Sequence, residues 1–149
     1  MKMKKFSLEK YSSITRDDLF QISTDIEHFP LVMPNYFKSL SIVEESSKEK
    51  LVDEKISFLK KTVTVRTEHV VIFPNIHEVY ILTGPLKGTF FIEHYDVCNN
   101  GTKIRIDVSL SLNGLIRLIP FIQNIIARRM NFVFSEFLLC AEKFLKNSP

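Results

Sequence analysis

Residues 115–140, "LIRLIPFIQNIIARRMNFVFSEFLLC", decide how this chain is expected to fold. The stretch is strongly apolar, yet three arginines and Glu136 interrupt it. A helix that spans a membrane needs about 20 consecutive apolar residues, whereas the uncharged run here extends only from 118 to 127. The stretch therefore predicts a long helix of a globular domain, not a membrane span.

Two apolar stripes follow this predicted helix at the helical period. The first stripe comprises Ile119, Ile126, Met130, Val133, Phe137, Ala141 and Phe144. The second stripe comprises Leu118, Phe121, Ile125, Phe132 and Leu139. Apolar stripes at this spacing are usually core, so both are predicted to pack, as they would inside a strongly curved sheet. The alternative is that the second stripe, beside Arg117 and Arg128, contacts a membrane surface or a second copy. Pro120 is predicted in the first turn of the helix, where its missing N–H costs little.

The residues before this helix predict one strand, one short helix and then a series of strands. The strand covers 5–12, and the helix covers 15–24 with Thr15 and Asp18 forming a capping-box-like start. The six later strands are predicted at 38–46, 49–60, 62–73, 77–83, 89–98 and 102–112. A run of antiparallel strands between helices is an α+β plan.

The last predicted hairpin has the clearest sequence pattern. Asn100-Gly101 favours a two-residue type I′ turn, which would place Tyr95 opposite Ile106, Glu93 opposite Val108 and Phe91 opposite Leu110. On the outer face the same register pairs His94 with Asp107 and Asp96 with Arg105, both oppositely charged. Glu93 then falls on the apolar face. If 84–88 is a five-residue loop, Val79 lies opposite Glu93 and Ile81 opposite Phe91.

Composition indicates one domain over residues 1–149. A chain of this length buries roughly 70% of its unfolded surface. The net charge of +3, with acids and bases interspersed, is too weak to indicate DNA binding. Cys98 and Cys140 have no CxxC partner and suit a reducing cytoplasm. The N-terminal lysines precede no apolar stretch, so no secretory signal is expected. The predicted location is cytoplasmic, with peripheral membrane contact as the alternative.

Two stretches resemble a known family. They are "SITRDDLFQISTDIEHFPLVMPNYFKSLSIVEES" (13–46) and "LTGPLKGTFFIEHYDV" (82–97). With Phe29-Pro30, and with Gly84, Pro85 and Lys87 in the loop, they are similar to the START-like polyketide cyclase/dehydrase superfamily. Within it they resemble the coenzyme Q-binding and ribosome-association branch. That branch commonly has Trp where Glu93 stands, and this chain has no Trp.

The resemblance implies a helix-grip fold, in which a curved antiparallel sheet of about seven strands wraps the C-terminal helix, with short helices after the first strand. It also implies a cavity between sheet and helix for a lipid, a polyprenyl quinone or another hydrophobic molecule. From the strand register, the predicted wall comprises Val79, Ile81, Phe91, Glu93, Tyr95, Ile106 and Val108. The helix residues that face it are Ile122, Ile126, Arg129 and Val133. Glu93 and Arg129 are predicted to meet, directly or through water, as the polar end of an apolar pocket.

Catalytic motifs are weak in this sequence. Neighbours in a strand point to opposite faces, so Glu68-His69 and Glu93-His94 are not local acid–base pairs. Glu93 and Tyr95 are the only internal acid–base candidates for a cyclase or dehydratase. No spacing of Cys, His or Asp indicates a metal, and no cofactor is expected. A non-catalytic carrier is therefore favoured over an enzyme, or over a ribosome-associated protein that uses the basic face of Arg117, Arg128 and Lys146.

Overall fold

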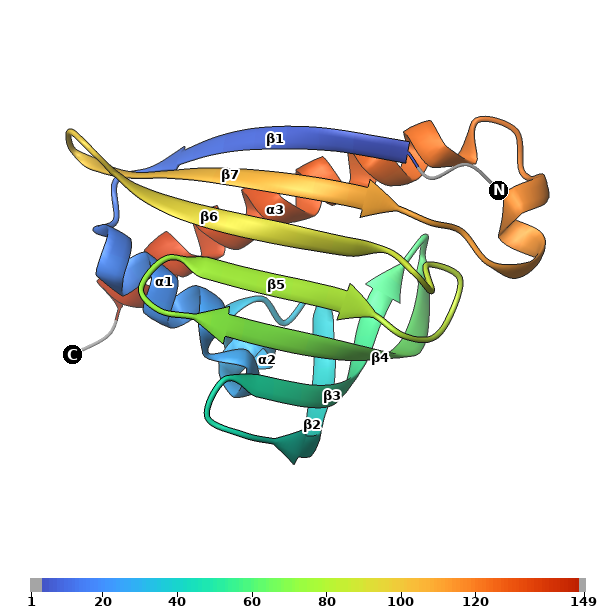
Figure 1. Cartoon of the computed structure of the whole chain (residues 1–149), viewed down its shortest axis with the longest axis horizontal. Coiled ribbons are helices and arrows are strands. Elements are labelled where there is room, and N and C mark those ends of the chain that lie inside the picture. Colours follow the sequence, from blue (N-terminus) through green and yellow to red (C-terminus); the bar gives the residue numbers. More distant parts are fainter. Residues whose placement is uncertain (1–3, 148–149) are drawn as a thin grey trace.

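The computed structural model describes residues 4–147 and contains one seven-stranded antiparallel sheet (Figure 1). Its strand order is β1-β7-β6-β5-β4-β3-β2. The strands are β1 (Lys4–Ser12), β2 (Phe37–Glu45), β3 (Glu49–Phe58), β4 (Lys61–Ile72), β5 (Ile76–Ile81), β6 (Phe90–Cys98) and β7 (Gly101–Leu110). All seven predicted strands are present, with ends that differ by a few residues.

The helices occupy one side of this sheet. They are α1 (Arg16–Thr24), η1 (Ile26–His28), α2 (Phe29–Val32), η2 (Gly114–Leu118) and α3 (Ile122–Lys146). The predicted N-cap of the first helix is confirmed, because the Thr15 side chain accepts a hydrogen bond from the Asp18 N–H at 3.4 Å. Within residues 4–147, no helix has both the length and the apolar character that crossing a membrane would require.

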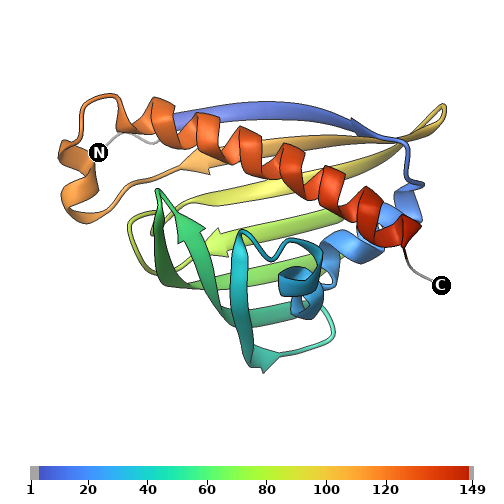
Figure 2. The same ribbon diagram turned by 180° about the vertical axis from the view of Figure 1, so that it is seen from behind.

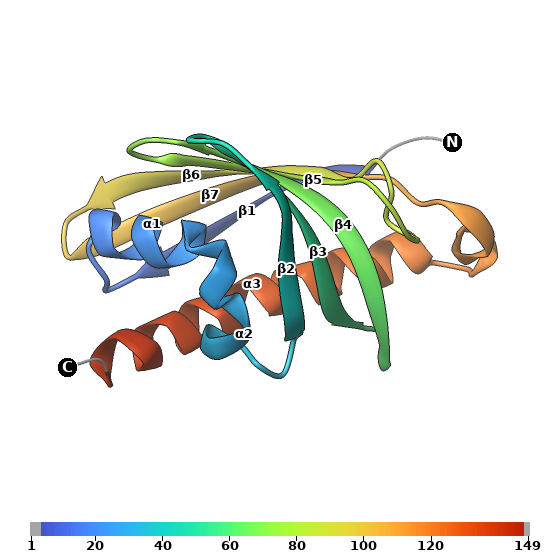
Figure 3. The ribbon, with the colours of Figure 1, turned by 90° about the horizontal axis from the view of Figure 1, so that it is seen from below.

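The sheet is curved, and α3 lies along its concave side (Figures 2 and 3). β2, β3 and β4 bend away from the direction of the other strands and cross α3 at a steep angle (Figure 3). The short helices α1 and α2 lie beside the C-terminal half of α3 and cover the same side of the sheet. This is the α+β helix-grip fold that the sequence predicted.

The alternation in β7 explains how the sheet forms its core. Ile104, Ile106 and Val108 on one face are buried, whereas Arg105 between them is exposed. Because side chains alternate along a strand, the apolar set lies toward α3 and the charged set toward solvent. Leu110 at the end of the strand is fully enclosed, at 0% exposure.

The predicted hairpin register was wrong by two residues. Cys98 pairs with Gly101, so the two-residue turn is Asn99-Asn100 and not Asn100-Gly101. Tyr95 therefore lies opposite Ile104, Glu93 opposite Ile106 and Phe91 opposite Val108. A shift of two residues keeps each side chain on its face, so Glu93 does lie on the inner face.

The outer face of the hairpin changes its partners with this shift. Asp96 lies opposite Lys103 instead of Arg105. His94 lies opposite Arg105, yet its Nε2 still reaches Asp107 Oδ2 diagonally at 3.5 Å. The predicted contact between His94 and Asp107 is therefore confirmed, although its geometry is diagonal and not directly cross-strand.

The β5–β6 register was wrong in the same way. Phe91 lies opposite Val79, and Glu93 lies opposite His77. Pairing continues past the end of β5, since the Ile81 N–H donates to the Thr89 carbonyl at 2.9 Å. The loop therefore spans 82–88 and begins two residues before the expected 84–88. Gly84 has a φ of +88°, in the region that glycine adopts without strain.

The two stripes of α3 have different surroundings. Ile126 and Ala141 of the first stripe are buried, and its middle residues are half-buried, but Ile119 and Phe144 at its ends are exposed. The prediction that the second stripe packs was wrong. Its five residues are all exposed, from 42% at Ile125 to 80% at Phe121. Curvature brings the sheet around one side of the helix only, so this flank stays in solvent.

The start of α3 also differs from expectation. Pro120 lies before the helix, whose N-cap is Phe121. Phe121 has a φ of +61°, a left-handed conformation that is uncommon for a non-glycine residue. The chain turns here between η2 and α3, beyond one end of the sheet (Figure 1).

Candidate functional site: the cavity between sheet and helix

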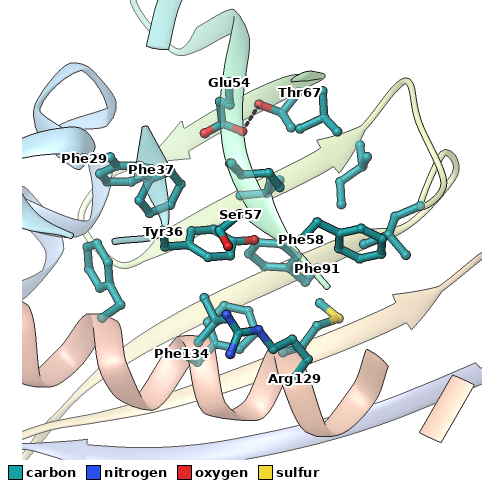
Figure 4. Close-up of a pocket in the computed structure, with 18 of the residues that line it drawn as sticks. Phe29, Tyr36, Phe37, Glu54, Ser57, Phe58, Thr67, Phe91, Arg129 and Phe134 are labelled. Carbon is teal, nitrogen blue, oxygen red and sulfur yellow. Dashed lines mark hydrogen bonds between the residues drawn. The ribbon is translucent and has the colours of Figure 1, made fainter. Parts of the chain in front are cut away.

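A cavity of about 150 Å³ lies between the bent part of the sheet and α3 (Figure 4). A cavity of about this volume with an apolar lining accommodates a benzene-sized molecule. Its wall is mostly aliphatic and aromatic. The aromatic side chains that line it are Phe29, Tyr36, Phe37, Phe58, Phe91, Phe134 and Phe137.

The two ends of the cavity differ in exposure. Phe58, Leu86 and Arg129 line one end and are only partly buried. Phe58 is the last residue of β3, and Leu86 lies in the loop between β5 and β6. Glu54 and His69 line the other part and are buried. The end near Arg129 is therefore the more accessible one.

The structure brings most of the predicted wall together. Seven of the predicted residues line the cavity: Val79, Ile81, Phe91, Glu93, Ile126, Arg129 and Val133. Tyr95 and Ile106 line a small pocket of about 20 Å³ that shares Glu93 with it. Val108 and Ile122 lie in the packed core. Whether a ligand contacts any of these residues remains a prediction.

A continuous chain of buried polar side chains crosses the inner face of the sheet, from β3 to β6. Thr67 Oγ1 lies 2.7 Å from Glu54 Oε2 and 3.1 Å from His69 Nε2. His69 Nδ1 lies 2.9 Å from His77 Nε2. His77 Nδ1 and the Tyr95 hydroxyl both contact Glu93 Oε1, at 2.7 and 2.8 Å. We call these six residues the polar chain.

Strand pairing positions the polar chain. Glu54 and Thr67 lie on adjacent strands, while His77 and Glu93 are direct cross-strand partners. Each residue occupies the inward position of its strand, and Val52, Ile56, Val65 and Val71 share the inner face of β3 and β4 with them. The imidazole rings of His69 and His77 stack, with centroids 5.1 Å apart. The strands therefore fix the order and the spacing of the groups.

Burial changes the protonation preferences of this site. It lowers the pKa of His69, because an imidazolium would lose its hydration, although the Glu54 carboxylate opposes the shift. Burial raises the pKa of the Tyr95 phenol well above its usual value, and the nearby Glu93 charge adds to this. Burial likewise raises the pKa of Tyr36, with Glu54 adding to the shift and Arg129 opposing it. A neutral His69 and neutral phenols are favoured.

The predicted direct contact between Glu93 and Arg129 is not formed. Glu93 is 9% exposed, and its hydrogen bonds go to His77 and Tyr95. The guanidinium of Arg129 lies 5.2 Å from the centre of the Phe132 ring. Within the described part of the chain, no ion pair joins Arg129 to a carboxylate. The partner of Glu93 comes from its own sheet because the true register places His77 opposite it.

Seven polar residues that line the cavity escaped sequence reasoning: Ser23, Tyr36, Glu54, Ser57, Thr67, His69 and His77. The pattern that would have located His69 is the alternation of Val65, Thr67 and Val71, which share its face. Glu54 similarly lies between Val52 and Ile56 on β3. The adjacency of Glu68 and His69 in the sequence gives no indication of these inward positions. His77 additionally required the correct register with Glu93.

The site offers hydrogen-bonding and acid–base groups within an apolar cavity. Among residues 4–147, no group of three or more His, Cys, Asp or Glu side chains is arranged to hold a metal ion. The polar chain instead contains two carboxyls and two imidazoles in direct contact, which is an arrangement that can hold and move protons.

Comparisons with known proteins identify the fold but not the activity. No family model and no curated protein matches this chain. It is similar to the di-domain aromatase/cyclase BexL from the BE-7585A biosynthetic pathway, with 11% identity and a TM-score of 0.82. That match covers 99% of this chain but 51% of BexL, so the chain spans about half its length.

Two further solved structures match over most of both chains. A START superfamily protein from Mycobacterium smegmatis has 9% identity and a TM-score of 0.75, covering 94% of this chain and 98% of the other. Norcoclaurine synthase from Thalictrum flavum, in complex with dopamine and hydroxybenzaldehyde, has 11% identity and a TM-score of 0.73, covering 99% and 89%. At such low identity these similarities establish a shared fold alone.

Proposed function

We propose that this protein binds a hydrophobic small molecule in the cavity between the sheet and α3, and acts as a carrier of that molecule. The observation that supports this most directly is the cavity itself, about 150 Å³ in volume and lined mainly by aromatic and aliphatic side chains. Apolar pockets with a few polar groups are the usual form of small-molecule sites. The similarity in fold to a protein solved with small aromatic molecules agrees with this function.

The proposed ligand is a lipid or a polyprenyl quinone-like molecule. A volume of about 150 Å³ accepts one ring or a short acyl segment. The rest of a longer molecule would leave the cavity at its partly exposed end, beside Phe58 and Arg129. A ring would then lie near the polar chain, and a tail would lie along the surface of α3.

Contact with a membrane surface is a second element of the proposal. Leu115 and Leu118 of η2 and Phe121 at the N-cap of α3 are 82%, 76% and 80% exposed. Arg117 and Arg128 are exposed at the same end of the helix. An apolar group flanked by cations inserts into anionic bilayers. Such contact would let a lipid enter the protein without crossing water.

Blocking the cavity tests the carrier proposal. Val133→Trp, on the cavity side of α3, should weaken binding of the fluorescent probe N-phenyl-1-naphthylamine by at least about tenfold, because the indole occupies the site. Phe132→Trp, on the adjacent exposed position, is the matched control and should bind normally. Equal binding by the two variants would place the probe elsewhere.

Native mass spectrometry of protein purified from its own host would identify the ligand. A retained lipid of unaltered mass supports the carrier function. A supplied polyketide-like substrate that loses water in the presence of the protein would instead favour the cyclase or dehydratase alternative. In that case Glu93 and Tyr95 are the candidates for acid–base roles, because both are buried in the polar chain.

A further inference from the structure

The polar chain needs one more proton than its groups ordinarily supply. It contains five hydrogen bonds, and each requires one proton between two heavy atoms. With both carboxylates ionised and both imidazoles neutral, only Thr67, Tyr95 and one N–H from each imidazole donate. Four protons cannot fill five hydrogen bonds. In one of the five contacts, two lone pairs would then face each other with no proton between them, which is costly in a buried site. The chain is complete only when it holds one extra proton.

The two carboxyls offer two places for the extra proton. In the first arrangement the Glu54 carboxyl is protonated and donates to Thr67, Thr67 donates to His69 Nε2, and both imidazoles carry their proton on Nδ1. In the second, every proton has moved one step along the chain. Glu54 is then ionised, Glu93 is protonated, and both imidazoles carry their proton on Nε2. All five hydrogen bonds and the net charge are the same in both arrangements.

An imidazolium at His69 or at His77 would also complete the five hydrogen bonds. Both rings are buried, and an imidazolium beside two carboxylates would leave three charges away from water, whereas a protonated carboxyl leaves one, so the extra proton is assigned to a carboxyl. The charged and titratable groups around the Glu54 end are Arg129 of α3, Tyr36 of the α2–β2 connection and His69 of β4. Tyr95 of β6 and His77 of β5 face the Glu93 end.

One oxygen of Glu54 remains open to the cavity. Oε2 contacts Thr67 at 2.7 Å, whereas His69 Nε2 lies 3.6 Å from Oε1, a long contact that leaves this oxygen able to accept a further hydrogen bond. Across residues 4–147, no fully buried side-chain nitrogen or oxygen lacks a hydrogen-bond partner, so Oε1 borders free space. Figure 4 shows Glu54 above the aromatic lining, with one oxygen directed at Thr67 and the other away from it. An acceptor in this position suits a ligand that donates a hydrogen bond.

We propose that the cavity takes a hydrophobic alcohol or phenol whose O–H is donated to Glu54 Oε1, and that the polar chain then passes one proton from Glu54 to Glu93. This inference rests on the proposed binding function and names the chemical class of its ligand. An ionised acceptor forms a shorter and stronger hydrogen bond than a neutral one, so the ligand hydroxyl favours the second arrangement. Ethers and ketones have no proton to donate to Glu54.

Paired aromatic probes test the ligand class. Wild-type protein should bind 1-naphthol roughly tenfold or more tightly than 1-methoxynaphthalene, since a hydrogen bond to a charged group contributes this much. Glu54→Gln should reduce that preference to a few-fold, because the amide keeps the contact with Thr67 but offers only a neutral acceptor. Glu49→Gln, an exposed glutamate on the same strand, should keep the full preference.

The outcomes separate this inference from the carrier function. Binding of both probes with the same ratio in wild type and Glu54→Gln would overturn the proposed ligand class while leaving the cavity as a binding site. Failure of both probes to bind wild-type protein would overturn the binding function and this inference together.

Nitrogen-15 NMR of the histidine rings tests the proton transfer itself. On addition of 1-naphthol, His69 and His77 should change from the Nδ1–H to the Nε2–H tautomer, whereas 1-methoxynaphthalene should leave them unchanged. In Glu54→Gln both rings should stay in the Nδ1–H form with either probe. Tautomers that do not respond to bound 1-naphthol in wild type would overturn the transfer.

Discussion

Side chains alternate between the two faces of the sheet in all its strands, but the inner faces of the strands at its two sides differ in character. Along β7, the inner face presents Ile106, Val108 and Leu110, which pack directly with Ile122 and Ile126 of α3. Along β3 to β5, the inner positions include Glu54, His69 and His77. The sheet bends here (Figure 3), and a cavity lies between this part of the sheet and α3. The first region is a close-packed core that supplies stability. The second region is less closely packed and provides space and polar groups, as a binding site requires.

The comparison predicts a large difference between two core substitutions. Leu110→Ala should lower the free energy of unfolding by about 2–5 kcal/mol, because it creates a new cavity in a packed region. Val65→Ala, in the wall of the existing cavity, should cost only about 1–2 kcal/mol. Urea denaturation monitored by circular dichroism measures both. Equal losses would mean that the two regions are packed alike.

The pH dependence of stability probes the polar region next. Burial lowers the pKa of His69, so the unfolded state takes up a proton there at a higher pH than the folded state. The stability that neutral His69 contributes is present above about pH 6.5 and is lost as the pH falls, by at most about 1.4 kcal/mol per pH unit. The advantage of wild type over His69→Gln should therefore shrink between pH 7 and pH 5.

Exposed His28 provides a control, because its contribution to stability should depend on pH in the opposite direction. A hydrogen bond to Asp25 raises the pKa of His28, so its contribution is present at low pH and is lost as the pH rises through the folded pKa. The difference between wild type and His28→Gln should grow as the pH falls. The same trend for both histidines would contradict the assignment of His69 as a buried neutral residue.

The exposed turn before α3 should have the smallest effect on stability. Phe121→Ser should change the free energy of unfolding by less than about 0.5 kcal/mol, because the side chain is 80% exposed. The same substitution should markedly reduce co-sedimentation with phosphatidylglycerol vesicles. Leu139→Ser, at the distant end of the same stripe, should leave vesicle binding intact. Absence of binding to anionic vesicles by wild type would remove membrane contact from the proposal.

The fold was predictable because it depends on local patterns. Alternation in β7, the Thr15 cap and the helical period of α3 each identify an element without knowledge of its neighbours. The faces of the strands were also predictable, since an error of two residues in register leaves them unchanged. The exposure of Phe121 was not predictable, because an apolar stripe has the same sequence pattern whether it packs in the core or faces a partner.

The polar chain could not be predicted from local sequence patterns. It depends on registers across four strands, and the hairpin turn that was expected at Asn100-Gly101 forms one position earlier, at Asn99-Asn100. A separate error, the expected five-residue loop at 84–88, placed Val79 instead of His77 opposite Glu93. Glu93 was therefore recognised as unusual, but its partner was sought on the helix instead of on the neighbouring strand.

The open sheet leaves two outer strands, and their sequences bear on self-association. β1 carries Lys4, Lys5 and Lys10, and the amine of Lys10 hydrogen-bonds Asn131 and Ser135 of α3. β2 has irregular pairing between Phe37 and Ser39 and again between Ile42 and Glu44. Lysines and bulges on outer strands obstruct the edge-to-edge pairing that leads to aggregation and fibrils. The lysines of β1 and the irregular pairing of β2 therefore disfavour edge-to-edge joining of this sheet with other copies.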